Sequence, residues 1–361
     1  MPTNKNQHFV PRCHLKPFTL NSEGLSINLF NLDRKRLITN APAKHQCSRD
    51  YFYGTSDELE EGIQLIESSY SESLRNVMEN SRYLSDANES IFKMFWLFQH
   101  LRTEAAAMRA VEMTESTRTL VNLPPEEFSL GIKEAVQVAC KTFASAMYEI
   151  DDLKFCIFKN KSSVPFITSD NPAVLTNKWQ IDKPRSSTSF GMGSAGVIII
   201  LPLTPKLLFL GYDGDVYSVP NDKGIVEVKS DRDAIAFNRH QFLQCTANVY
   251  PGTTTKEESL IDHYSAIEAS RPKSRHIIHY AEFDGVVDGH KRYKVVKPEE
   301  RSEVTEAMIH AQVVHPNPLT WPSQIRIRPN GAVYSNDTGV GYVRASKTFI
   351  TANRVFRKTR P

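Results

Sequence analysis

The spacing of apolar residues changes near Leu153, and this change limits the folds that the chain can adopt. Between about residues 57 and 150, apolar residues recur every three or four positions, which is typical of amphipathic helices. The first such stripe is Leu59, Ile63, Ile66, Tyr70 and Leu74. After Leu153, short runs rich in β-branched residues, such as 197–203 and 206–212, predict strands. Helices and strands therefore come in blocks, which favours an α+β fold over a doubly wound sheet.

The expected architecture is a helical block at about residues 57–150, packed against a mostly antiparallel sheet. The sheet is expected to contain an N-terminal hairpin at 25–39 together with strands from residues 153–220 and 275–350. Asp213-Gly214 and Asn330-Gly331 are turn signals, and they predict two further hairpins.

Three long helices are predicted in the helical block. Ser56 suits the N-cap of the first, and the second runs from about Ala87 to Arg118. Pro124-Pro125 is expected to open the third, which would extend to about Ile150. The polar stretch 177–194 predicts a long loop or lid.

The net charge of the 361-residue chain, +3, is too small to indicate a partner. Its distribution is more informative, because the segment after Ile325 has eight basic residues and one acid, Asp337. The basic residues are Arg326, Arg328, Arg344, Lys347, Arg354, Arg357, Lys358 and Arg360. Such a tail can follow a phosphate backbone or form a solvated face, and the sequence leaves both interpretations open.

The cysteines are scattered, odd in number and without a C-x-x-C pair. They are Cys13, Cys47, Cys140, Cys156 and Cys245. This pattern argues against a disulfide framework and against a structural zinc site. The sequence also has no apolar segment of signal-peptide or membrane-spanning length. We therefore expect a soluble cytoplasmic protein without a membrane partner.

The N-terminal stretch Gln7-His8-Phe9-Val10-Pro11-Arg12 places a histidine and an arginine around an apolar pair and a proline. Pro11 fixes its own φ and favours extended geometry at Val10. In an extended segment His8, Val10 and Arg12 would share one face, while Phe9 would anchor the other face on the core. This pattern predicts a cleft that receives His8 and Arg12, although an edge strand with a hydrogen-bonded histidine would have the same sequence.

The predicted helices carry polar residues beside their apolar stripes. Glu60, Gln64 and Glu67 are spaced by four and three, so they share one side of the first helix. Carboxylates on a helix edge can bind a divalent cation or transfer protons, but they can also simply form the solvent-exposed side of the helix. Gln99 and Arg102 follow an aromatic run on the second helix, so Arg102 must find an acidic partner or an anionic ligand.

The segment Thr168-Ser169-Asp170-Asn171-Pro172 follows a buried strand that the proline must end. Asp170 offers a metal ligand or a general base, and Asn171 offers a donor and an acceptor. The alternative is a turn in which both side chains only satisfy the local backbone. Asn238 is a weaker candidate, as a polar residue within a mostly apolar helix.

Several catalytic motifs are missing from the sequence. It has no Walker loop, no G-x-S-x-G, and no H-x-E with paired cysteines. These absences disfavour ATP-driven, α/β-hydrolase and zinc-deaminase activities.

Taken in order, these motifs resemble the bacterial HFVP-signature family, a domain of unknown function (number 4238). The residues that carry the resemblance are His8-Phe9-Val10-Pro11, Leu59-Glu60 with Glu67, 99–103, 167–172, the helix around Asn238, and 247–250. The resemblance covers about residues 6 to 285. It implies a domain at 1–285 with one core, a strand-rich basic extension at 286–361, and a shared cleft for the scattered polar residues. Cys13-His14 departs from the family pattern, where an aromatic or aliphatic pair is expected, and the basic tail lies outside it.

The first functional expectation is a hydrolase that acts on nucleic acid or a nucleotide, by metal-assisted phosphodiester cleavage, in a setting such as anti-phage defence. The expected catalytic residues are His8, Glu67 and Asp170. The expected ligands of a Mg²⁺ ion are Glu60, Glu67 and Asp170. The residues expected to bind substrate are Gln7, Arg12, Gln99, Arg102, Asn171 and Asn238. Two alternatives stay open: a metal-free DNA N-glycosylase that uses Asp170 and Asn171 on a flipped base, and a non-catalytic sensor of a nucleotide or phage component.

Overall fold

The computed structural model describes residues 5–182, 189–287, 289–302, 305–349 and 355–361. These residues form helices together with several largely antiparallel sheets, which confirms the predicted α+β class. In the described part of the chain, no helix is both long and apolar enough to span a membrane.

The largest sheet lies at the centre of the molecule and has the strand order β11-β5-β9-β8-β7. Its strands are β5 (Lys154–Asn160), β7 (Val174–Thr176), β8 (Ile198–Thr204), β9 (Leu207–Tyr212) and β11 (Ile225–Val228). All neighbours are antiparallel except β11 and β5. Every residue of β8 and β9 is buried, because helices cover both faces of the sheet. This explains their continuously apolar sequences.

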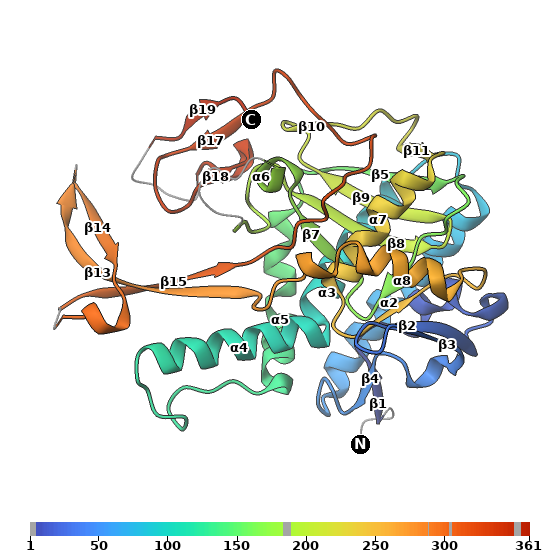
Figure 1. The fold of residues 1–361 in the computed structure, drawn as a ribbon, viewed down its shortest axis with the longest axis horizontal. Coiled ribbons are helices and arrows are strands. Elements are labelled where there is room, and N and C mark those ends of the chain that lie inside the picture. Colours follow the sequence, from blue (N-terminus) through green and yellow to red (C-terminus); the bar gives the residue numbers. More distant parts are fainter. Residues whose placement is uncertain (1–4, 183–188, 288, 303–304, 350–354) are drawn as a thin grey trace.

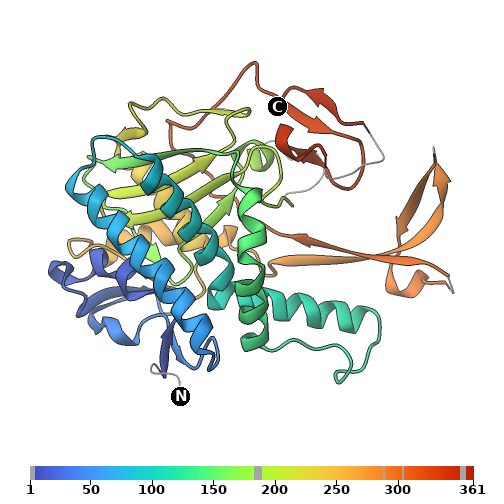
Figure 2. The same cartoon turned by 180° about the vertical axis from the view of Figure 1, so that it is seen from behind.

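Helices α2 (Asp57–Glu79) and α3 (Asp86–Arg102) lie across one face of the central sheet (Figure 2). Helix α7 (Asp231–Gln244) covers the other face (Figure 1). Alternate residues of β5 divide accordingly, since Ile157 packs with Phe92 of α3 while Phe158 packs with Phe237 of α7. The result is a three-layer core with the sheet in the middle.

The predicted second helix is two helices in the structure, α3 and α4 (Glu104–Leu120). The chain breaks at Thr103, which has extended φ and ψ and accepts a hydrogen bond from Ala106 N at its Oγ1 (3.2 Å). The predicted third helix, α5 (Ile132–Ala146), begins seven residues after Pro125. Its start is set by Gly131, whose N–H donates to the Glu134 carboxylate (3.0 Å), and not by the prolines.

A second sheet has the strand order β3-β2-β12-β6 and is antiparallel throughout. Its strands are β2 (Ser26–Asn31), β3 (Arg36–Pro42), β6 (Thr168–Ser169) and β12 (Asn248–Tyr250). Strands β2 and β3 form the predicted N-terminal hairpin. Strand β12 pairs with β6, so the segment that contains Asp170 lies beside residues that follow α7.

Strands β13 (His276–Val287), β14 (His290–Val295) and β15 (Ala307–Val313) form an antiparallel arm that projects from the body (Figure 1). A small sheet near the C-terminus contains β17 (Val333–Ser335), β18 (Tyr342–Val343) and β19 (Arg357–Thr359). The remaining elements are β1 (Asn6–His8), α1 (Arg12–Leu15), β4 (Ser48–Asp50), α6 (Lys178–Asp182), β10 (Tyr217–Ser218), α8 (Glu257–Ser265) and β16 (Arg326–Ile327). Helix α6 lies within the predicted loop at 177–194, of which residues 183–188 are outside the described residues.

Two predicted hairpins are wrong. β10 pairs with β16, about a hundred residues later in the chain, and not with β9 across Asp213-Gly214. β17 pairs with β18 and β19, so Asn330-Gly331 does not join two paired strands. Both turns exist locally, but the strands that follow them pair with distant segments of the chain.

Part of the basic C-terminal segment is buried. Arg344 is 2% exposed and pairs with Asp152, through Nε at 2.8 Å and Nη2 at 3.0 Å. Lys347 is also 2% exposed and lies 3.7 Å from a Glu149 oxygen. These two cations fasten the C-terminal segment to the end of the helical block, so neither predicted role, phosphate contact or solvated face, applies to them. Arg354 lies outside the described residues.

Candidate functional site

Residues 7–12 do not form the single extended segment that the sequence predicts. β1 ends at His8, and Pro11 (φ −70°, ψ 151°) is the N-cap of α1, so Arg12 is a helical residue. Phe9 and Val10 are both buried, at 6% and 0% exposure, and the predicted alternation of faces therefore stops after His8. The resulting turn still brings His8 and Arg12 to one pocket.

This pocket, here called the His8 pocket, has a volume of about 210 Å³. One wall is the turn between β1 and α1, and the other is the first half of α2. Its lining residues are Asn6, Gln7, His8, Arg12, Cys13, Tyr53, Ser56, Glu60, Ile63, Gln64 and Glu67. The predicted stripe of Glu60, Gln64 and Glu67 thus faces the predicted His8 and Arg12.

Arg102 lies behind the pocket and does not line it. Its side chain is fully buried, with its guanidinium 4.5 Å from the centre of the Phe98 ring. Nη1 donates to the Glu67 carboxylate at 2.8 Å, and Nε donates to Gln99 Oε1 at 3.1 Å. Gln99 in turn donates to the carbonyl oxygen of Phe9 (2.7 Å). This chain of contacts ties the N-terminal turn to α2 and α3.

Two buried polar atoms at this place have no hydrogen-bond partner among the described residues: Nε2 of His8 and Nη2 of Arg102. Leaving a buried polar atom unpaired costs free energy, and nearly all such atoms in folded proteins have a partner. Arg12 and Glu60 also lack an ion pair to any described residue. His8, Arg12 and Glu60 line the same pocket, with Arg102 behind it, and such a group is expected where a ligand supplies the missing contacts.

The surroundings of His8 favour its neutral form. Burial, together with the positive charges of Arg12 and Arg102, lowers the pKa of His8 to about 4, although a backbone hydrogen bond to Lys44 acts in the opposite direction. At neutral pH the ring is therefore uncharged, and its unpaired nitrogen can take up a proton.

A protein-family model described as a protein of unknown function (DUF4238) matches residues 6–255. The chain belongs to this family. Comparison with curated proteins and with solved structures finds no match. The matched residues contain the His8 pocket and the segment around Asp170, which confirms the resemblance on which the shared-site expectation depends, and the match ends before the predicted limit of 285.

Within the DUF4238 region, the Asp170 turn (residues 168–172) lies apart from the His8 pocket, and Asp170 does not line that pocket. Its carboxylate accepts three backbone N–H groups, from Thr246 (2.7 Å), Ala247 (2.8 Å) and Asn248 (2.9 Å). Burial raises the pKa of Asp170, whereas these three donors favour the charged form. The carboxylate therefore holds the segment between α7 and β12, and it does not reach His8 as the predicted site requires.

Asn171 and Asn238 use both ends of their side-chain amides within the protein. Asn171 Oδ1 accepts from the Thr103 hydroxyl, and its Nδ2 donates to the carbonyl of Gln244, each at 3.0 Å. Asn238 Oδ1 accepts from Ile167 N (3.1 Å), and its Nδ2 donates to the carbonyl of Pro165 (2.9 Å). These amides position the Asp170 turn and the strand before it.

Gln7 lines the His8 pocket, but its amide is also used. Its Oε1 accepts from Tyr53 N (2.7 Å), and its Nε2 donates to the carbonyl of Gly54 (3.0 Å). Tyr53 in turn donates its hydroxyl to the carbonyl of His8 (2.9 Å). Gln7 and Tyr53 thus fix the backbone that presents His8.

The residues predicted to hold Mg²⁺ do not fit a magnesium site. Asp170 is taken by three N–H groups, and Glu67 is paired with Arg102, which leaves Glu60 alone. Among the residues that the structure describes, no three His, Cys, Asp or Glu side chains are placed to hold a metal ion. The predicted ligand set is therefore not assembled.

Sequence reasoning did not single out Tyr53, Ser56 or Asn6 for the pocket, and it gave Gln64 no role beyond its place between two glutamates. Asn6, Tyr53 and Ser56 come before α2, from a part of the chain whose path depends on the pairing of β1 with β4, whereas Gln64 lies on α2. The departure at position 14 also has a structural explanation. His14 is fully buried and hydrogen-bonds Tyr70 (2.9 Å) and Thr168 (3.0 Å), so it joins α1 to α2 and β6.

Proposed function

We propose that the chain is a hydrolase of nucleic acid or a nucleotide, that its site is the His8 pocket, and that it cleaves without a metal ion held by Asp170. The observation that carries the proposal is the unpaired Nε2 of His8, buried beside an arginine and a glutamate that lack partners among the described residues. A histidine that is neutral at pH 7 can act as a general base.

In this mechanism, Arg12 binds the scissile phosphate and stabilises the negative charge that grows in the transition state. His8 Nε2 accepts a proton from the attacking water, whose oxygen bonds to phosphorus as the bond between phosphorus and the leaving sugar oxygen breaks. The leaving oxygen takes its proton from solvent water. Glu60 accepts a hydrogen bond from that water or from a sugar hydroxyl. The volume of about 210 Å³ admits a phosphate with part of its sugar, while the rest of the substrate would lie outside the pocket.

Arg102 would act from behind the pocket. Its charge is balanced by Glu67 at 2.8 Å, so the pair fixes the floor of the site while Arg12 faces the substrate. In this proposal Glu67 is a positioning residue for Arg102 and not a proton-transfer group.

The main alternative is a sensor that binds a nucleotide in the same pocket without cleaving it. Arg12 alone would serve this role, and the loss of His8 would then leave binding intact. The N-glycosylase alternative is less well supported, because it relies on Asp170 and Asn171, whose side chains are both occupied by other groups of the protein.

The test is cleavage of end-labelled single- and double-stranded oligonucleotides and of bis(4-nitrophenyl) phosphate, each with and without EDTA. We expect His8→Gln to slow cleavage by roughly a hundredfold, the usual contribution of a general base. Arg12→Gln should weaken binding and slow cleavage. Arg75→Gln is the matched control, since Arg75 is an exposed arginine elsewhere on α2, and it should behave as the unmodified protein.

The outcomes are distinct. Cleavage that EDTA abolishes would contradict the metal-free mechanism. If the unmodified protein binds a substrate but does not cleave it, and Arg12→Gln abolishes that binding, the sensor hypothesis would replace the hydrolase hypothesis. An unmodified protein that neither binds nor cleaves any of these substrates would overturn both.

A further inference from the structure

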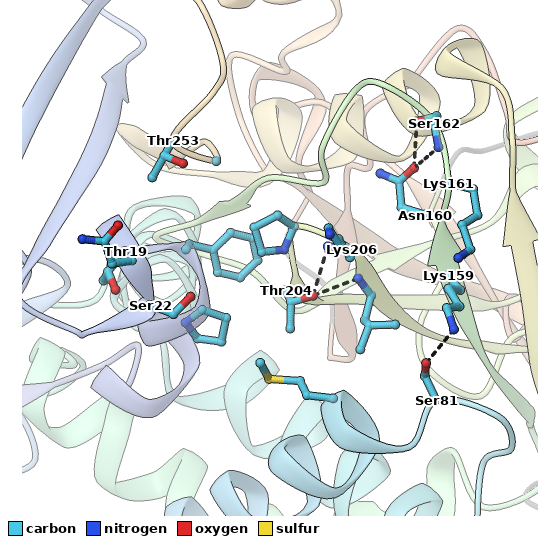
Figure 3. Close-up of a pocket in the computed structure, with 17 residues that line it drawn as sticks. Thr19, Ser22, Ser81, Lys159, Asn160, Lys161, Ser162, Thr204, Lys206 and Thr253 are labelled. Carbon is cyan, nitrogen blue, oxygen red and sulfur yellow. Dashed lines mark hydrogen bonds between the residues drawn. The ribbon is translucent and has the colours of Figure 1, made fainter.

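A second and larger pocket lies at the far end of α2 and has a volume of about 810 Å³ (Figure 3). Its walls come from five separate segments: residues 17–22, the end of α2 with Ser81, the end of β5 with the turn after it, the turn between β8 and β9, and residues 252–253. We call it the lysine pocket, after Lys159, Lys161 and Lys206.

The lining of the lysine pocket has one sign of charge. Among the described residues that form this lining there are the three lysines and no aspartate or glutamate, together with hydroxyl and amide side chains. Figure 3 shows Thr19 and Ser22 on one side of the pocket and the lysines on the other. None of the three lysines has an ion pair with a described carboxylate, and Glu227, the acid that lies near Lys159 and Lys161, is paired with Lys229 at 3.1 Å. A pocket of this kind raises the local concentration of anions.

Two of the lysines stand on turns that are held in shape by buried side chains. Asn160 is 8% exposed, and its Oδ1 accepts from the N–H (2.9 Å) and the hydroxyl (2.7 Å) of Ser162, which fixes the turn that carries Lys161. Thr204 Oγ1 accepts from the N–H groups of Lys206 and Leu207, each at 3.0 Å. These bonds, drawn in Figure 3, order the backbone before any ligand arrives. A preorganised site loses less entropy on binding.

The third lysine is held directly. Lys159 Nζ donates to the Ser81 hydroxyl at 2.8 Å, so its charge stays at the pocket wall. The pocket also has an apolar side, to which Pro17, Met78 and Pro205 contribute. Its volume lies within the range of about 300–1,000 Å³ that is usual for small-molecule sites.

We infer that the lysine pocket binds a nucleotide-sized small molecule that carries phosphate groups, with the phosphates on the three lysines and the uncharged part against the apolar side. The positive charge of the pocket, its hydrogen-bonded turns and its volume together support this assignment. Met78 is eleven residues after Glu67, which places the two pockets about 16 Å apart along the axis of α2. The inference is thus independent of the proposed hydrolase activity.

The experiment is isothermal titration of the full chain with ADP, pyrophosphate and adenosine, for the unmodified protein and for Lys161→Gln/Lys206→Gln. Both lysines are exposed, so the double substitution should leave the fold intact. We expect ADP and pyrophosphate to bind, adenosine to bind at least tenfold more weakly than ADP, and the double variant to lose at least tenfold in affinity for ADP. Lys141→Gln/Lys273→Gln makes the same change in net charge at two other exposed lysines, and it should retain the affinity.

Equal affinity of ADP for the two double variants would overturn the inference, as would adenosine binding as tightly as ADP. An oligonucleotide that binds through Lys161 and Lys206 when ADP does not bind would also overturn it, in favour of a nucleic-acid backbone. All titrations are made in an Arg12→Gln background, so that nucleotide bound in the His8 pocket does not contribute. Failure of the hydrolase proposal and failure of this inference then give different results.

Discussion

The His8 pocket and the Asp170 turn contain the same kinds of side chain, but they differ in how those side chains are satisfied. Around Asp170, the carboxylate oxygens accept three backbone N–H groups, and the Asn171 amide has a partner at each end. Around His8, one ring nitrogen has no partner among the described residues, and neither Arg12 nor Glu60 has an ion pair there.

This difference indicates different roles. Polar groups that are fully paired with the backbone stabilise a particular chain path, and they have little capacity left for a ligand. Polar groups left unpaired at a pocket reduce stability in the absence of a ligand and gain contacts when one binds. We therefore assign the Asp170 turn to structure and the His8 pocket to ligand binding.

The largest expected effect is acid unfolding, to which His8 and His14 contribute together with the buried His100, His240 and His315, whose pKa values burial also lowers. Burial lowers the pKa of His14 to about 3 and, with Arg12 and Arg102, that of His8 to about 4. As the pH falls, the histidines of the unfolded chain bind protons near pH 6.5, whereas those of the folded protein bind them only near pH 3–4. The free energy of unfolding is therefore unaffected by these groups above pH 6.5 and decreases as the pH falls toward 3. His14 alone should account for several kcal/mol, at about 1.4 kcal/mol per pKa unit. Urea unfolding at pH 7, 5.5 and 4.5 measures this, and equal stability at all three would contradict it.

The next effect concerns the Asp170 turn. Asp170→Asn replaces a carboxylate oxygen with an NH₂ group opposite backbone N–H donors, so we expect it to lower the free energy of unfolding by about 2–4 kcal/mol. Cleavage or binding per folded molecule should stay unchanged. Denaturant unfolding and an activity assay on the same preparation measure both. The control is Asp222→Asn at an exposed position, expected within about 0.5 kcal/mol of the unmodified protein. If the Asp170→Asn variant is as stable as the unmodified protein but has no activity, the functional site would have to be reassigned to the Asp170 turn.

A smaller effect separates the two glutamates that line the His8 pocket. Glu67→Gln leaves the fully buried Arg102 without its countercharge, and we expect a loss of about 1–3 kcal/mol in the free energy of unfolding. Glu60→Gln is the same substitution two turns earlier on the same helix, and it removes no ion pair to a described residue. It should change stability by less than about 0.5 kcal/mol. Equal losses for the two variants would mean that the Arg102 pair does not fix the pocket floor.

Much of the fold could be predicted from the sequence, because the signals involved are local. The apolar stripe of α2, its Ser56 cap and the continuous apolar runs of β8 and β9 depend on neighbouring residues only. The hairpins at Asp213-Gly214 and Asn330-Gly331 were predicted wrongly, since their strands pair with segments far away in the chain. At the break, Thr103 caps α4 locally through Ala106 N and also makes a tertiary contact, its hydrogen bond to Asn171.

The candidate site could be predicted in part for the same reason. Helical spacing placed Glu60, Gln64 and Glu67 on one side of α2, and the structure brings His8 and Arg12 to them. The sequence could not show that the carboxylate of Asp170 is occupied by the N–H groups of 246–248, because no local pattern encodes those bonds. It also could not show the lysine pocket, whose lysines meet only when β5 and β9 pair.

The most direct test of the His8 pocket is the pKa of His8, followed by NMR of ¹³C-labelled histidine and assigned with His8→Gln. Lys161→Gln/Lys206→Gln is the background, so that the lysine pocket does not contribute. In the free protein the pKa should be about 4. Saturation with thymidine 5′-monophosphate should raise it, because the phosphate offsets the positive charges of Arg12 and Arg102 and can accept a hydrogen bond from the protonated ring. A His8 pKa near 6.5 in the free protein, or a value that does not move when the nucleotide is bound, would contradict our assignment of the ligand site to the His8 pocket.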